Sequence, residues 1–117
     1  MVVTNIWVRT TVQGFHNWPQ PYKGREYLAD RHRHLFHVEV EVPVSHDDRD
    51  IEFHDLLDEV NGWLRQFRGE FGPRSCEAIA RELGKFVLLS HPIGTVKITV
   101  SEDGEAGAVV VLERAAG

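Results

Sequence analysis

Apolar and polar residues alternate along three stretches of this chain, and a fourth stretch is a short, continuously apolar run. A period of two is typical of a β-strand with one buried face, and a short apolar run between turns is consistent with a buried strand. We therefore predict four strands, over residues 3–13, 33–43, 96–101 and 108–112. Asp103 and Gly104 form the last turn, residues 17–31 are predicted to be a long loop, and residues 113–117 a frayed tail.

Between the second and third predicted strands, the apolar residues recur every three or four positions, as they do in amphipathic helices. The first helix is predicted over about residues 51–67, and the chain is interrupted before Pro73. Ser75 is suited to cap a second helix, which ends near His91. The order ββααββ predicts a single α+β domain over residues 1–117, with a four-stranded antiparallel sheet and both helices packed on one face.

Composition and charge limit the classes of function. The chain has 117 residues, 42% hydrophobic and 26% charged, and a formal net charge of −5. Nucleic acid is not expected as the main partner, because phosphate contacts need clustered Lys and Arg, which are scattered here. We expect no membrane span and no signal peptide, because no segment has the required length and hydrophobicity. The single cysteine, Cys76, suits a cytoplasmic protein.

Three histidines are candidate metal ligands. His32 and His34 open the second predicted strand on the parity of its apolar face, and His16 has the same parity after the first strand. Side chains two residues apart on a strand point to the same face, so the three imidazoles could converge at one end of a hairpin. Three protein ligands and an open position are typical of a catalytic zinc. The alternative is that these are solvated surface histidines, since the chain has seven.

A carboxylate and a thiol also fall at informative positions. Glu102 follows the third predicted strand on the parity of its buried face, where a carboxylate is costly without a partner. Alternatively, it is a turn residue that points to water. Cys76 shares the helical phase of Ile79 and Leu83, which favours a core position or a pocket wall near the start of the second helix over a nucleophile.

Four short motifs occur in an order that resembles the 6-pyruvoyltetrahydropterin synthase and 6-carboxytetrahydropterin synthase family. They are the three histidines in Gly14-Phe15-His16 and His32-Arg33-His34, then Glu52-Phe53, Ser75-Cys76-Glu77, and Glu102 in the segment from Val100 to Gly107. The resemblance covers roughly residues 5–113, and the motifs fall on matching elements. The order of the four motifs along the chain carries the resemblance.

The resemblance implies a T-fold and a zinc ion bound by His16, His32 and His34, with a fourth position open to substrate. The implied activity is that of a lyase acting on dihydroneopterin triphosphate or a close relative, with zinc polarising the oxygens of the pterin side chain. The implied substrate-binding residues are Glu102, Ser75 and Cys76. Among these, the Glu102 carboxylate would accept hydrogen bonds from the N–H edge of the pterin ring.

Two departures from the family pattern concern catalysis. The synthases use a cysteine before the His-x-His pair for proton transfer, whereas this chain has none there; Glu26 is the candidate replacement, as in family members that carry a glutamate. The family's Asp-His pair has no counterpart in residues 68–73. Glu26 is either a general base whose pKa is raised by burial or a solvated loop residue. The chain is accordingly a lyase or, alternatively, a non-catalytic T-fold protein that binds a pterin or purine-like ligand.

The predicted sheet would have one uncovered face and two open edges, which need a partner. The residues on that face, among them Trp7, Arg9, Leu35 and Glu39, are too polar as a group for a dry core. Several sheets joined edge to edge into a barrel would satisfy both edges. The family forms trimers that stack into hexamers with active sites between subunits, so the resemblance implies self-association as a trimer or hexamer.

Overall fold

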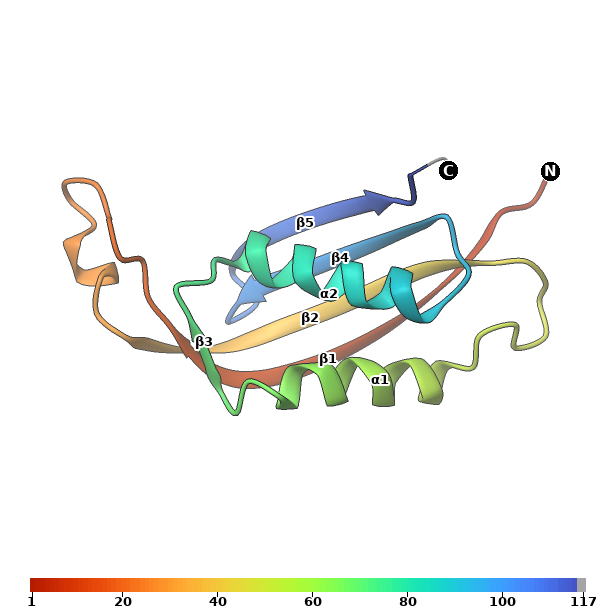
Figure 1. Cartoon of the computed structure of the whole chain (residues 1–117), viewed down its shortest axis with the longest axis horizontal. Coiled ribbons are helices and arrows are strands. Elements are labelled where there is room, and N and C mark those ends of the chain that lie inside the picture. The colour runs from red at the N-terminus through yellow and green to blue at the C-terminus, as the bar shows by residue number, and fades with distance from the viewer. Residues whose placement is uncertain (116–117) are drawn as a thin grey trace.

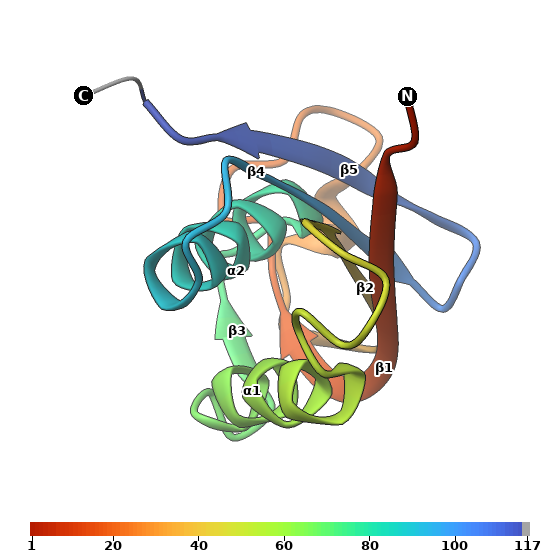
Figure 2. The same ribbon diagram turned by 90° about the vertical axis from the view of Figure 1, so that its right-hand side faces the viewer.

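The computed structural model describes residues 1–115 and shows a curled sheet with two helices on one of its faces (Figures 1 and 2). The elements are β1 (Thr4–His16), β2 (His32–Val44), α1 (Phe53–Arg65), β3 (Glu70–Gly72), α2 (Cys76–Ser90), β4 (Thr95–Glu102) and β5 (Ala106–Glu113). A single 3-10 turn, Glu26–Leu28, lies in the long loop between β1 and β2, which projects beyond the sheet in Figure 1. The predicted α+β class and the order of the six main elements are confirmed.

The sheet has one strand more than predicted. β1 pairs antiparallel with β2, β2 with β4 and β4 with β5, whereas the short β3 pairs parallel with the end of β1. The Phe15 N–H donates to the Gly69 carbonyl at 2.7 Å, and the Asn17 N–H donates to the Gly72 carbonyl at 2.9 Å. The fully buried Phe71 lies between these two bonds. The prediction of four antiparallel strands is therefore wrong in this detail, because the segment between the two helices forms a short fifth strand, β3, that pairs parallel with β1.

The observed bounds differ from the predicted ones where hydrogen bonds extend or end an element. β1 continues to His16 because its register with β2 is unbroken up to the pair formed by His16 and His32. α1 begins after Glu52, whose side chain accepts hydrogen bonds from two backbone N–H groups of the first turn. Ser75 caps α2 as predicted, since its side chain accepts from the Ala78 N–H.

The C-terminal segment is more ordered than predicted. Glu113 belongs to β5, and the Arg114 guanidinium donates to three carbonyls in the last turn of α2 and just after it, those of Leu88, His91 and Ile93. A cation at this position suits the negative end of the helix dipole. The predicted fraying is therefore wrong for Glu113 and Arg114, and residues 116–117 of that tail lie outside the described residues.

The core lies between the sheet and the helices. α1 packs on β1, and α2 packs on β4 and β5. The even-numbered apolar residues in the middle of β2 and β4 are almost completely buried, as their alternation predicts: Phe36, Val38, Val40, Val42, Val96, Ile98 and Val100. Gly14 has no room for a side chain, because a Cβ there would lie 2.5 Å from the Phe71 ring. Among the described residues, no helix combines the length and the hydrophobicity needed to cross a membrane.

Candidate metal centre

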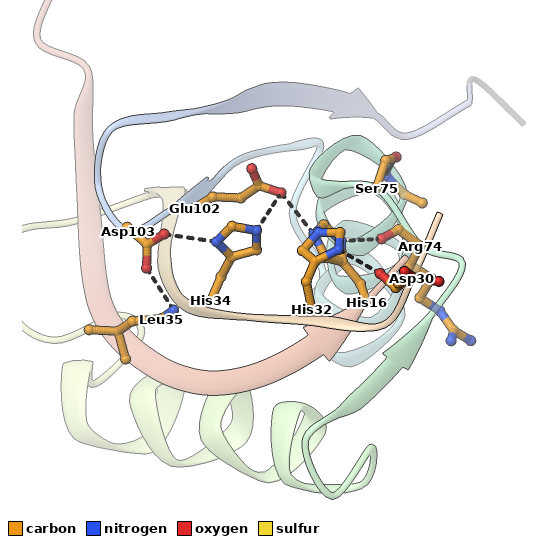
Figure 3. A network of polar contacts seen from close by, with 10 residues as sticks. His16, Asp30, His32, His34, Leu35, Arg74, Ser75, Glu102 and Asp103 are labelled. Atoms are coloured by element: carbon orange, nitrogen blue, oxygen red, sulfur yellow. Dashed lines mark hydrogen bonds and ion pairs between the residues drawn. The ribbon is translucent and has the colours of Figure 1, made fainter. Parts of the chain in front are cut away.

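The three predicted metal ligands lie together at one end of the sheet (Figure 3). His16 and His32 are cross-strand partners with ring centroids 4.6 Å apart, and the His34 ring lies 5.2 Å from that of His16. One nitrogen from each histidine and one Glu102 oxygen all lie within 4.8 Å of one another. This group could hold a metal ion. The three histidines converge because they have the same parity on two paired strands.

Each histidine has its Nδ1 atom engaged. The acceptors are the Arg74 carbonyl for His16 at 2.9 Å, the Asp30 carbonyl for His32 at 2.9 Å and the Asp103 carboxylate for His34 at 2.8 Å. A carbonyl oxygen can only accept, so Nδ1 carries a proton in His16 and His32, and in a neutral imidazole Nε2 then keeps its lone pair. Metal-binding histidines typically donate their second ring N–H in this way.

Two of the free nitrogens are buried without a hydrogen-bond partner, namely Nε2 of His16 and Nε2 of His34. Glu102 Oε2 lies 2.9 Å from the first and 3.6 Å from the second, but neither contact has hydrogen-bond geometry. Buried polar atoms rarely remain unsatisfied. Nitrogen and carboxylate donors at a divalent ion suit zinc, so the residues present fit the implied metal.

A pocket of about 510 Å³ adjoins the histidines. It is lined by His16, His32 and Glu102, by Ser75, Cys76 and Glu77 at the start of α2, and by apolar walls that include Trp18, Leu28 and Pro73. The predicted substrate-binding residues thus lie beside the candidate metal ligands. Burial, with the charges of Glu102 and Glu77, raises the pKa of Cys76 to about 12, so its thiol stays protonated and forms part of the wall.

Glu26 lies outside this set of pocket-lining residues in the single chain. It is exposed on the projecting loop, and its carboxylate accepts from the Gly24 N–H at 3.0 and 3.1 Å. The backbone N–H groups of Glu26 and Gly24 lower its pKa, which is opposite to the rise by burial that a general base was expected to need. Leu28, from the same 3-10 turn, does line the pocket.

Asp103 is the residue at the site that sequence reasoning missed. The Leu35 N–H and then His34 donate to its carboxylate and lower its pKa. Asp103 and Gly104 both have positive φ angles, 58° and 71°, which fit a tight turn between β4 and β5. The Asp-Gly pair indicated that turn, but its contact with His34 depends on the pairing of β2 with β4.

The fold is the T-fold seen in 6-pyruvoyltetrahydropterin synthases. The structure of the Plasmodium falciparum enzyme matches with a TM-score of 0.68 and 17% identity, covering 96% of this chain and 99% of that one. Two Plasmodium vivax structures, in which a glutamate described as a catalytic residue is replaced by alanine or cysteine, give TM-scores of 0.68 and 0.69. Their identities are 16% and 13%, and each match covers 97% of this chain and 100% of the other.

No protein-family model matches the sequence, and comparison with curated proteins finds no match. At these low identities, the likeness to the solved structures establishes the fold. The predicted resemblance to the synthase fold is thereby confirmed, and the reaction must be argued from the site.

Proposed function

We propose that this protein is a zinc-dependent lyase of the 6-pyruvoyl- or 6-carboxytetrahydropterin synthase type. The proposed substrate is dihydroneopterin triphosphate or a close relative. The observation that carries the proposal is the convergence of His16, His32 and His34, with Nδ1 engaged and Nε2 free, beside a pocket that His16 and His32 line, within a T-fold. Similarity to synthases at the level of fold supports the reaction class.

His16, His32 and His34 would hold the zinc, which would act as a Lewis acid and polarise an oxygen of the pterin side chain. The apolar walls would contact the flat ring and exclude water from the reacting carbon. Ser75 caps α2 with its oxygen, which leaves its hydroxyl hydrogen available to a ligand in the pocket.

Two carboxylates line the pocket and could accept the paired N–H groups of a pterin ring. Glu102 is the predicted acceptor, but its Oε2 also lies 2.9 Å from His16 Nε2. Glu77 is exposed in the first turn of α2 and lines the same pocket. We therefore propose that the ring edge is bound by Glu102, by Glu77 or by both, in the bidentate manner typical of a carboxylate.

Glu26 is our candidate for the general base. The Plasmodium vivax synthases have a glutamate described as catalytic, which supports a carboxylate in this role. The exposure and lowered pKa of Glu26 in the single chain favour a second candidate function, a T-fold protein that binds a pterin or purine-like ligand without turnover.

We also propose self-association as a trimer or hexamer. β5 and most of β1 form open edges of the sheet within residues 1–115, since β3 pairs only with the end of β1. On the face opposite the helices, Trp7 is 53% exposed and Val109 is 57% exposed. Pairing of β5 with β1 of a second copy would satisfy both edges. It would also bring a neighbouring surface towards the projecting loop that carries Glu26.

The test is turnover of dihydroneopterin triphosphate by the zinc-loaded protein, with triphosphate release and pterin products followed by chromatography. We expect a metal-dependent product that His32→Ala abolishes, while His54→Ala, which changes an exposed histidine on α1, leaves it intact. Glu26→Gln should retain bound zinc and pterin but lose turnover. Stoichiometric zinc and pterin binding without any product would instead establish the binding function, and the absence of bound metal and pterin would refute both.

A further inference from the structure

We propose that Asp103 is a positioning residue of the metal centre, which orients His34 so that its Nε2 faces the cation. The proposal rests on the proposed metal site and adds to it a residue beyond the three histidines. Asp103 follows Glu102 at the turn from β4 to β5, distant in sequence from His34 but next to it in space (Figure 3).

His34 lies between two consecutive carboxylates. Asp103 Oδ2 lies 2.8 Å from its Nδ1, and Glu102 Oε2 lies 3.6 Å from its Nε2. An ionised carboxylate can only accept, so the hydrogen bond from Nδ1 to Asp103 requires the proton on Nδ1. The lone pair of a neutral His34 is thereby directed from Nε2 towards Glu102 and the other histidines.

Asp103 is itself held in place by β2. Its second carboxylate oxygen, Oδ1, accepts from the Leu35 N–H at 2.9 Å, and its own N–H donates to the Leu35 carbonyl at 2.8 Å. The carboxylate thus spans His34 and the next residue along the same strand. The carboxylate cannot rotate away from the imidazole without also releasing the Leu35 N–H. The turn therefore fixes both the orientation of the His34 ring and the nitrogen that carries its proton.

The other two histidines are oriented by the main chain. The carbonyls of Arg74 and Asp30 accept from His16 and His32, and substitution of those side chains leaves both carbonyls in place. Within residues 1–115, Asp103 is the one side chain that forms a hydrogen bond with a ring nitrogen of the three histidines. A carboxylate acceptor also makes the imidazole a better donor to a metal. This contact is therefore the one that a point substitution can remove.

The test measures zinc affinity of the full chain by competition with a chromophoric chelator and records the visible absorption of the cobalt-substituted protein. Asp103→Asn should weaken zinc binding by about 10- to 100-fold, the usual effect of removing such a partner, and alter the cobalt spectrum. Asp103→Gly tolerates the positive φ of this turn and removes the carboxylate altogether, so it should lose at least as much affinity.

Two matched controls separate charge from contact. Glu105→Gln removes a carboxylate from the same turn, and Asp30→Asn removes one beside His32 while retaining the carbonyl that His32 uses. Both should bind zinc as the wild type does. Wild-type affinity and an unchanged cobalt spectrum in the two Asp103 variants would overturn the proposal, even if their stability fell. A wild-type protein that binds no zinc would instead overturn the proposed metal site itself.

Discussion

Truncation of Phe36 should test whether the aromatic ring that packs against His16 and His34 stabilises the fold. The Phe36 side chain is 1% exposed, and its ring centroid lies 5.1 Å from that of His16, 5.8 Å from that of His34 and 5.3 Å from that of Phe71. It therefore joins the candidate metal centre to the core. An exposed phenylalanine, Phe53, is 54% exposed at the start of α1 and provides the matched control.

The magnitude follows from the burial. A buried phenylalanine removes about 200 Å² from water, which at about 25 cal/mol per Å² corresponds to about 5 kcal/mol as an upper value. Phe36→Ala retains the Cβ and should cost about 3–5 kcal/mol, whereas Phe36→Leu fills most of the space and should cost about 1–2 kcal/mol. Phe53→Leu should change the free energy of unfolding by less than about 0.5 kcal/mol.

The assay is urea unfolding of the metal-free protein, monitored by far-ultraviolet circular dichroism. With a slope of about 1–3 kcal/mol per molar urea, a loss of 1.5 kcal/mol lowers the midpoint by about 0.5–1.5 M. The slope should be the same in Phe36→Leu and in the wild type. A Phe36→Leu midpoint as close to the wild type as that of Phe53→Leu would show that Phe36 is not part of a close-packed core, because its ring could then be replaced without cost.

Two further predictions concern ionisable groups. Because the pKa of Cys76 is raised to about 12, its alkylation by iodoacetamide at pH 8 should be about a thousandfold slower in the native protein than in urea; comparable rates would contradict the protonated, buried thiol. Hydrogen bonds from the Ser45 N–H and hydroxyl lower the pKa of Asp50 in the folded protein. Asp50 therefore stabilises the fold above about pH 4, its pKa in the unfolded chain, and this contribution is lost as the pH falls through its lower pKa in the folded protein. Asp50→Asn should therefore reduce the loss of unfolding free energy between about pH 4 and pH 2. Asp48→Asn, which changes an 85% exposed carboxylate, should not reduce it. The same decrease in unfolding free energy over this pH range in the Asp50 variant and in the wild type would disprove the prediction.

The parts of the fold that could be predicted are those that the local periodicity of apolar residues indicates. Alternation in β1, β2 and β4 identified both the strands and their buried faces. A strand with one face in the core and the other outside it has a period of two, because successive side chains point to opposite faces. The same parity predicted that His16, His32 and His34 would converge. That inference required β1 to pair with β2 without a bulge, and their register is unbroken.

The parts that could not be predicted depend on pairing between distant segments. β3 has three residues, too few to show a period; it pairs with the end of β1, and its central residue, Phe71, is buried in the core. Arg114 is in an unpatterned tail but reaches the end of α2. The contact of Asp103 with His34 follows from the register of β4 on β2. Glu26 differs again, because its exposure depends on how the whole loop between β1 and β2 folds, which no local pattern in residues 17–31 encodes.

The shared parity of the candidate metal centre and the core has a consequence for the sequence changes that this protein can tolerate during evolution. In β2, His32 and His34 face the same side as Phe36 and Val38, so site and core form one continuous row. A residue inserted between His34 and Phe36 would turn the histidines to the opposite face while the valines stayed buried. Evolution can therefore exchange single side chains on the outer face of β2 without moving the histidines, but it cannot alter the length of the strand there without losing the row, unless a bulge absorbs the extra residue.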